Sequence, residues 1–401
     1  MAGLESDQMW TWRSAGVTER NMRTPIALLG AATILVLGLV SYRIFGRRPM
    51  LLLCLLMALS PWHLWMSQVG RFYMQLFLLY NLGLLLYFQA TQGGRLSLAV
   101  ASMLAIVLAF FTTPIALMIL GVFGLDVAIS WLRRRPTGMR ASFWVVGAVA
   151  LAVCATGVLL TFANRAEGSA FIGSPQSIPV MTMGMVYMIG VPVVVTAVLG
   201  FWCLSASDER LAILLALAAV VPLITFVGFS VLGFDSHVRY TFVGLFAWLA
   251  LAAVGLEVVI TSVQDRWGHL AASLPVLALL STLAIADYVY MTSGAGYRGL
   301  WNQAMAYVET HRGPGELVGG DLVARWMIQY YLEEPDALLL PGRDADGNAT
   351  DLVRGPAWLV YRVDQPSTGD RSHELPLTGQ LEAYFNNQIA GPYQAINVYY
   401  Y

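Results

Sequence analysis

Long apolar segments are the feature that most constrains the fold of this chain. The hydrocarbon core of a bilayer is about 30 Å thick, so a helix that crosses it needs about 20 predominantly apolar residues. The sequence predicts about ten such spans, separated by short polar stretches. Their limits are 24–45, 49–66, 71–90, 97–113, 114–132, 141–163, 182–204, 209–232, 240–260 and 268–290. The expected fold class is therefore an α-helical polytopic membrane protein.

Composition indicates two regions with different solvents. Hydrophobic residues make up 58% of the chain and charged residues 12%, whereas a soluble domain usually carries about 25% charged residues. The acidic residues are unevenly placed, because 13 of the 24 lie between Glu309 and Glu382. The sequence therefore predicts a transmembrane domain at 24–290 and a water-soluble domain at 293–401. Residues 1–23 are expected to be the remnant of an extracytoplasmic loop.

The region after residue 293 alternates between helical and extended patterns. Apolar residues at a spacing of three to four predict helices, and runs of β-branched and aromatic residues predict strands. Helices are expected at 299–311 and 322–332, and strands at 316–319, 357–363 and 395–401. A small α/β domain is the expected form of this region.

The distribution of arginine predicts the orientation of the spans. One set of loops holds ten arginines, namely Arg43, Arg47, Arg48, Arg95, Arg133, Arg134, Arg135, Arg140, Arg210 and Arg266. The opposite set, between spans, holds only Arg71, Arg165 and Arg239. Cytoplasmic loops retain positive charge, so the C-terminal domain is expected outside the cytoplasm of a plasma (bacterial inner) membrane. Residues 1–23 contain no span or signal peptide that would export them, so a helix and its loop are expected to precede Met1.

Charge and cysteine content argue against several other classes. The net charge is -1, and no basic run exceeds the three arginines at 133–135, so a nucleic-acid partner is not expected. Cys54, Cys154 and Cys203 lie in apolar stretches without metal-ligand or disulfide spacing. No cofactor is predicted, and the sequence leaves the use of a divalent metal open.

The most informative stretch is Ser60–Tyr73, at a predicted extracytoplasmic membrane surface. It reads SPWHLWMSQVGRFY and concentrates polar and aromatic groups. One interpretation is an interfacial belt, because tryptophan and tyrosine prefer the headgroup level and an arginine at a helix end extends toward water. The other interpretation is a functional site at the membrane surface.

This stretch also resembles a family signature. GT-C superfamily glycosyltransferases related to glycosyltransferase family 39 carry the pattern S-P-F-H-x-x-Y-S-Q-E-A-R-x-Y. That group includes protein O-mannosyltransferases and the aminoarabinose transferases that modify lipid A. The matching positions are Ser60, Pro61, His63, Ser67, Gln68, Arg71 and Tyr73, with Trp62 and Trp65 as aromatic replacements. Val69 and Gly70 depart from the Glu-Ala pair of the signature.

Further segments resemble the same family along nearly the whole chain. Residues 23–25 and 45–48 are similar to the two ends of the family's second helix, and His237–Tyr240 is similar to its late R-Y element. The segments that resemble the start of its C-terminal domain are 297–299, 314–316 and 330–332. Each of these short motifs is only moderately specific, but together they favour a GT-C-like transmembrane domain.

The resemblance implies a transferase that depends on a polyprenyl-phosphate carrier. Relatives take a sugar from this carrier at the outer face of the membrane and move it to an acceptor hydroxyl on a glycan, lipid or protein. Arginine binds phosphate with paired hydrogen bonds, so Arg71 and Arg239 are expected to bind the carrier phosphate. The other candidate substrate-binding residues are His63, Gln68, Tyr73 and Tyr240.

The general base of this family is an aspartate in the first extracytoplasmic loop, and no residue here matches it convincingly. Glu5 and Asp7 are early acidic residues, but they are better interpreted as part of a solvated tail. The catalytic residue is therefore unknown from the sequence. An inactive fragment of a transferase stays open as an interpretation.

A transporter or lipid-handling membrane protein is the alternative from a different class. Asp126 and Glu257 lie within predicted spans, where a carboxylate either joins helices or relays protons. A transporter more often shows two related halves with broken helices and polar residues at the midplane. The sequence contains no such internal repeat, so the transferase is the favoured interpretation.

Overall fold

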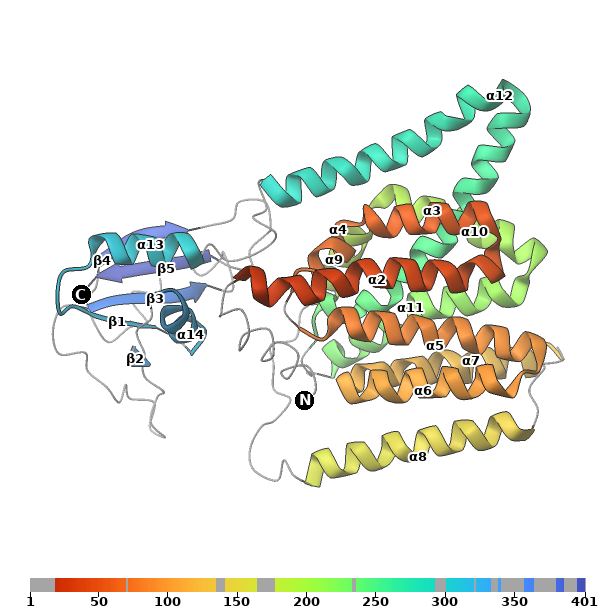
Figure 1. Ribbon diagram of the computed structural model, residues 1–401, viewed down its shortest axis with the longest axis horizontal. Coiled ribbons are helices and arrows are strands. Elements are labelled where there is room, and N and C mark those ends of the chain that lie inside the picture. The colour runs from red at the N-terminus through yellow and green to blue at the C-terminus, as the bar shows by residue number, and fades with distance from the viewer. Residues whose placement is uncertain are drawn as a thin grey trace. The chain divides into compact units, whose positions relative to one another are not determined.

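The computed structural model describes residues 19–69, 71–134, 141–163, 177–232, 236–292, 301–320, 322–332, 338–339, 357–363, 380–385 and 395–400. The chain divides into two compact units, Met1–Asp287 and Tyr288–Tyr401. Helices make up the described part of the first unit, whereas the second combines helices with a sheet (Figure 1).

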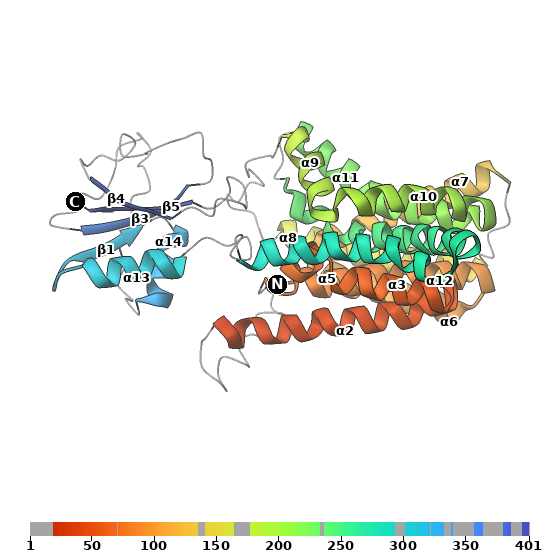
Figure 2. The ribbon, with the colours of Figure 1, turned by 90° about the horizontal axis from the view of Figure 1, so that it is seen from above.

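The longer helices of the first unit run back and forth past one another (Figures 1 and 2). Its first elements are α2 (Glu19–Phe45), α3 (Arg47–Ala58), α4 (Pro61–Met66), α5 (Tyr73–Gly93), α6 (Leu96–Thr112), the 3₁₀ helix η1 (Pro114–Leu117) and α7 (Met118–Leu132). The others are α8 (Ala141–Ala163), α9 (Ile178–Ile189), α10 (Val191–Ser207), α11 (Glu209–Val231), the 3₁₀ helix η2 (Val238–Gly244) and α12 (Leu245–Thr292).

Several of these helices can cross a bilayer. Within the described ranges, five helices are long and apolar enough to do so, or six if the bent pair α9–α10 is one span. The 17-residue α6 is apolar but shorter. The 48-residue α12 would be about 72 Å long as a straight helix, over twice the thickness of the hydrocarbon core. It instead turns at Gly268, which has a φ of 81°, and folds back (Figure 1). The chain is a polytopic helical membrane protein, as the sequence predicts.

Two predicted spans are not the single straight helices expected. The segment 49–66 divides into α3 and α4 at Ser60-Pro61, because a residue before proline is driven into extended backbone and Ser60 has φ -78° and ψ 118°. The segment 182–204 bends by 85° between α9 and α10. Gly190, with a φ of 90°, lies at that bend. The prediction of a loop between residues 260 and 268 is also wrong, because α12 stays helical up to its turn at Gly268.

A close crossing of α10 and α12 depends on two glycines. A Cβ atom added to Gly200 would overlap the carbonyl oxygen of Leu251, and one added to Gly255 would overlap the carbonyl oxygen of Thr196. Because glycine has no side chain, the two helix backbones can approach closely here. This contact fixes α12 against the bundle near the middle of its first leg.

The second unit contains two helices and a five-stranded sheet. Its elements are α13 (Trp301–His311), β1 (Leu317–Gly320), α14 (Leu322–Tyr331), β2 (Leu338–Leu339), β3 (Ala357–Val363), β4 (Gln380–Phe385) and β5 (Ala395–Tyr400). The strand order is β2-β1-β3-β5-β4. Strand β1 is parallel to β2 and β3, whereas β5 is antiparallel to β3 and β4. The helices and strands expected from the sequence are confirmed here, and β2 and β4 are additional.

The core of this unit joins α13, α14 and the first strands. Ala304, Met305 and Val308 form the buried face of α13, and Ile328 of α14 joins the same cluster. Val318, Trp358 and Val360 complete it from β1 and β3. The apolar spacing on α13 therefore buries one helix face against the sheet, as in other α/β layers.

Candidate functional site

The short helix α4 is held in place by local hydrogen bonds at both of its ends and by a close contact with α2. Ser60 caps α4, because its hydroxyl accepts a hydrogen bond of 3.4 Å from the backbone N–H of His63. The Ser67 hydroxyl donates to the carbonyl of His63 at 2.7 Å. A Cβ atom at Gly30 of α2 would collide with the Ser67 hydroxyl. The short helix α4 is therefore held closely against α2 just before the chain enters α5.

His63 is buried below this turn. Its side chain is 3% exposed, and its ring lies 5.9 Å from that of Phe77 in an edge-to-face arrangement. Within the described part of the chain, Nε2 of His63 has no hydrogen-bond partner. Gln68, in the same turn, is half-buried. His63 therefore faces the packed helices rather than an open surface.

The beginning of α5 brings two of the predicted residues together. Arg71 is exposed, whereas Tyr73, the first residue of α5, is 3% exposed. The guanidinium of Arg71 lies within electrostatic range of the Tyr73 hydroxyl. Arg239 and Tyr240 also interact electrostatically with this hydroxyl. The Tyr73 side chain thus joins residues that are far apart in the sequence.

Arg239 and Tyr240 lie on η2, at the entry to α12. The Nη2 atom of Arg239 donates to the Tyr240 hydroxyl at 3.4 Å, and the guanidinium lies 5.2 Å from the centre of the Tyr240 ring. Tyr240 also contacts the rings of Phe226 and His237 at 5.2 and 5.6 Å. These aromatic contacts hold the ring on which the guanidinium rests.

Aromatic packing fixes η2 against α4 and α5. The rings of Phe77 and Phe242 stack at 4.5 Å, and the Trp62 ring lies 5.6 Å from that of Phe242. The Asn81 side chain donates to the carbonyl of Val243 at 3.2 Å. The segments around positions 62, 77 and 242 therefore pack against one another. We use the name outer cluster for these segments and the four polar residues that they carry or adjoin, namely Arg71, Tyr73, Arg239 and Tyr240. Two guanidinium groups and two phenol hydroxyls in one cluster can hold an anion such as a phosphate.

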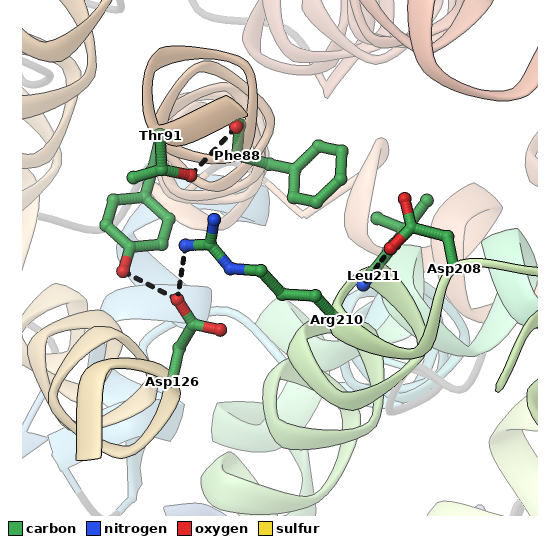
Figure 3. A network of polar contacts seen from close by, with 7 residues as sticks. Phe88, Thr91, Asp126, Asp208, Arg210 and Leu211 are labelled. Carbon is green, nitrogen blue, oxygen red and sulfur yellow. Dashed lines mark hydrogen bonds and ion pairs between the residues drawn. The ribbon is translucent and has the colours of Figure 1, made fainter. Parts of the chain in front are cut away.

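A second polar network lies near the opposite ends of the helices (Figure 3). The Tyr87 hydroxyl donates to Oδ2 of Asp126 at 2.7 Å, and Nη2 of Arg210 donates to the same oxygen at 2.9 Å. The side chain of Asp126 is 1% exposed and that of Arg210 is 12% exposed. We call these three residues, from α5, α7 and α11, the inner triad. The Asp126 carboxylate therefore accepts hydrogen bonds from a positively charged guanidinium and from a phenol hydroxyl.

The two intramembrane acids therefore have described partners. Asp126 belongs to the inner triad, and Glu257 pairs with Arg48 at 3.4 Å. Arg133 and Glu209 form a further ion pair at the same end. These pairs join different helices, which favours a packing role over a proton relay. The sequence singled out Asp126 but missed Tyr87 and Arg210, because no local spacing links residues 39 and 84 positions away.

Among the described residues, no group of three histidine, cysteine or acidic side chains could hold a metal ion. Glu5 and Asp7 lie outside the described residues. The arrangement that remains is the outer cluster, which is suited to binding an anion at a membrane surface.

Comparison with known proteins supports the fold. No protein-family model matches the chain, and no curated protein matches it in sequence. Crystal structures of ArnT from Cupriavidus metallidurans, in the apo state and bound to undecaprenyl phosphate, resemble it throughout. The apo structure is 14% identical, with a TM-score of 0.54, over 98% of this chain and 86% of that chain. The bound structure is 16% identical, with a TM-score of 0.55, over 98% and 87%.

Proposed function

This chain has the GT-C superfamily fold seen in ArnT, and on that basis we propose that it is a membrane glycosyltransferase. It would take a sugar from a polyprenyl-phosphate carrier and transfer it to an acceptor hydroxyl at the extracytoplasmic surface. One of the similar ArnT structures is bound to undecaprenyl phosphate, which supports a carrier of this class. The acceptor would be a glycan, a lipid or a protein.

The observation that carries the proposal is the packing of the segments that hold Arg71 and Arg239, through the stacked rings of Phe77 and Phe242 and the hydrogen bond from Asn81 to Val243, with the Tyr73 hydroxyl within electrostatic range of both guanidinium groups. Transfer of a sugar from the carrier leaves a lipid phosphate, whose negative charge requires cations or hydrogen-bond donors. Guanidinium groups stay charged and form paired hydrogen bonds with phosphate oxygens. In this proposal, Arg71 and Arg239 bind the carrier phosphate from two sides.

Tyr73 and Tyr240 would complete the phosphate site. A phenol hydroxyl can accept one hydrogen bond and donate another. When the Tyr73 hydroxyl accepts from Arg71, its own O–H is available to donate to a phosphate oxygen. Tyr240 would hold the guanidinium of Arg239 in place through its ring and hydroxyl. The phosphate would thus meet a cluster of positively charged and neutral donors.

His63 and Gln68 would act through the turn that carries Arg71. His63 is buried against Phe77, so we expect it to support α4 rather than to touch the carrier. Gln68 lies three residues before Arg71 and is half-buried, so its amide is a candidate contact for the sugar. These roles predict that His63 substitutions affect folding and carrier binding together, whereas Gln68 substitutions affect the sugar alone.

The proposed orientation places the outer cluster and the second unit outside the cytoplasm of a bacterial inner membrane. It follows from the ten-to-three distribution of arginine between the two sets of loops. The carrier phosphate would then lie at the outer headgroup level. Single cysteines placed at 133–140 should react with an impermeant reagent only after cells are permeabilised, and one at 343–351 should react in intact cells. The reverse pattern would contradict the orientation.

The test is carrier binding and sugar transfer by the full chain reconstituted in lipid vesicles. The expected result is binding of undecaprenyl phosphate that weakens about tenfold or more in Arg71→Ala, because a charged hydrogen bond is lost. Arg95→Ala is the matched control, since Arg95 is also exposed but lies at the other end of α5. Equal carrier affinity of the wild type and a well-folded Arg71→Ala protein would contradict the phosphate site.

A further inference from the structure

Four exposed tryptophans lie at the same end of the membrane unit. Trp131 is 78% exposed, Trp202 68%, Trp267 70% and Trp144 58%. They lie near the end of α7, the end of α10, the turn of α12 and the start of α8. At the end that carries the outer cluster, Trp62 is fully buried and Trp65 half-buried. Among the residues that the structure describes, exposed tryptophan therefore gathers at the end opposite to the outer cluster.

Arginines lie beside these tryptophans. Arg134 follows Trp131 at the end of α7, and Arg266 precedes Trp267 at the turn of α12. The turn between α2 and α3 lies at the same end of the bundle (Figures 1 and 2) and carries Arg43 and Arg47, which are also exposed. We call these four arginines and the four exposed tryptophans the inner ring.

Positive charge is in excess at this end. The described arginines there are Arg43, Arg47, Arg48, Arg95, Arg133, Arg134, Arg210 and Arg266, and the described acids are Asp126, Asp208, Glu209, Glu257 and Asp265. Three of the acids are bound in ion pairs with Arg210, Arg133 and Arg48. Asp208 caps α11 through the backbone N–H of Leu211. Eight arginines against five acids leave an excess of three positive charges among the described residues at this end, and the four exposed arginines of the inner ring take no part in the three ion pairs.

We propose that the inner ring is a binding surface for anionic phospholipid headgroups. Tryptophan prefers the boundary between headgroups and acyl chains, and arginine side chains extend from that depth toward charged headgroups. A cluster of exposed arginines beside a bilayer selects anionic over zwitterionic lipids. The surplus charge, rather than the tryptophans alone, indicates that the occupant is anionic.

The inner ring would also set the depth of the outer cluster. Helix α5 has 21 residues and a length of about 31 Å, close to the thickness of the hydrocarbon core, about 30 Å. Anchoring the ring at one headgroup level therefore places Tyr73, at the other end of α5, near the opposite headgroup level. A lipid surface on one side of the membrane would fix the position of the site on the other.

The test compares spin-labelled phosphatidylglycerol with spin-labelled phosphatidylcholine bound to the full chain in phosphatidylcholine vesicles. We expect the wild type to favour the anionic lipid by about threefold or more, with the preference falling as salt is added. A variant with Arg43→Gln, Arg47→Gln, Arg134→Gln and Arg266→Gln should lose most of this preference. The matched variant with lysine at the same four positions should keep it, because the charge is retained.

Melting in phosphatidylcholine vesicles identifies variants that fold as the wild type does. Equal binding of the two lipids by the wild type would overturn the proposal. Retention of the preference in a folded glutamine variant would also overturn it, since the lipid would then be recognised elsewhere. These measurements use no sugar transfer, so their outcome is independent of the proposed enzyme activity.

Discussion

The outer cluster and the inner triad both combine arginine with tyrosine, and the inner triad adds a buried carboxylate. In the inner triad, a single carboxylate oxygen accepts from both Arg210 and Tyr87, so the buried arginine and acid neutralise each other. In the outer cluster, Arg239 contacts the ring and hydroxyl of Tyr240, and Arg71 and Arg239 both lie within electrostatic range of the Tyr73 hydroxyl. The partner of the arginine, rather than the arginine itself, distinguishes a packing contact from a candidate ligand site.

Substitutions in the inner triad should affect the stability of the fold, whereas substitutions in the outer cluster should affect carrier binding. A buried ion pair is costly to break, because removal of one partner leaves an uncompensated charge. An exposed arginine such as Arg71 can be removed with little cost to folding but with loss of any anion that it holds. Substitutions at the two ends should therefore affect different measurements.

The largest expected effect is at the inner triad. Asp126→Ala or Arg210→Ala should lower the free energy of unfolding by about 3 to 5 kcal/mol, since each leaves a buried charge without its partner. The combined Asp126→Leu and Arg210→Met variant should recover most of that loss, because both charges are replaced by apolar groups. Denaturant unfolding in mixed micelles measures these differences.

Carrier affinity is the control for the inner triad. It should stay within about twofold of the wild type in every variant that folds, because the inner triad and the outer cluster lie at opposite ends of α5. A single substitution that costs less than about 1 kcal/mol would show that the pair is not a packing contact of this kind. A proton relay would then regain support as the role of Asp126.

The second effect is expected in carrier binding. Arg71→Ala and Arg239→Ala should each weaken binding of undecaprenyl phosphate by roughly ten- to a hundredfold, equivalent to about 1.5 to 3 kcal/mol. Lysine at either position should recover only part of the affinity, since an ammonium lacks the planar fork of donors. Titration of the carrier into reconstituted protein measures both effects.

The double variant tests whether the two arginines hold one phosphate. If they share it, the combined effect should fall short of the product of the single effects, because contacts with one group are rarely additive. A double variant that equals the full product would indicate two separate sites. The fold of each variant is checked by its melting temperature in detergent.

Much of this arrangement could be predicted because it follows from local patterns. Spans such as α8 and α11 appear in the sequence as long apolar runs, and the structure reproduces them with nearly the predicted limits. Arg71 and Arg239 could be singled out because each lies in a short polar and aromatic stretch at the end of a span. The packing of Phe77 on Phe242, which joins the segments that carry the two arginines, is not encoded by any local pattern.

The features that escaped prediction depend on single residues or distant contacts. Averaged hydropathy does not register Gly190, although one glycine with a positive φ allows the bend between α9 and α10. The strand Gln380–Phe385 contains glutamate and alanine, which are depleted in strands, and its two aromatic residues come only at its end. Pairing with β5 stabilises it instead. Arg210 gained significance only when folding placed it beside Asp126.

The smallest effects come from one change made at both ends of α5. Tyr73 begins this helix and Tyr87 lies 14 residues later, about 21 Å along its axis. Substitution of either tyrosine by phenylalanine removes one hydroxyl and keeps the ring. Tyr87→Phe retains the stacking on Phe123 at 3.8 Å but loses the hydrogen bond to Asp126. It should lower the free energy of unfolding by about 1.5 kcal/mol and leave carrier affinity unchanged.

Tyr73→Phe should show the reverse pattern. It removes a hydroxyl within electrostatic range of Arg71 and Arg239, so carrier affinity should fall by about three- to tenfold while stability changes by less than about 0.5 kcal/mol. Both variants are measured by carrier titration and by unfolding in the same micelles. The same change on the same helix thus reports binding at one end and stability at the other. If Tyr73→Phe lowered stability alone, the outer cluster would be a packing contact like the inner triad, and the contrast between the two ends would fail.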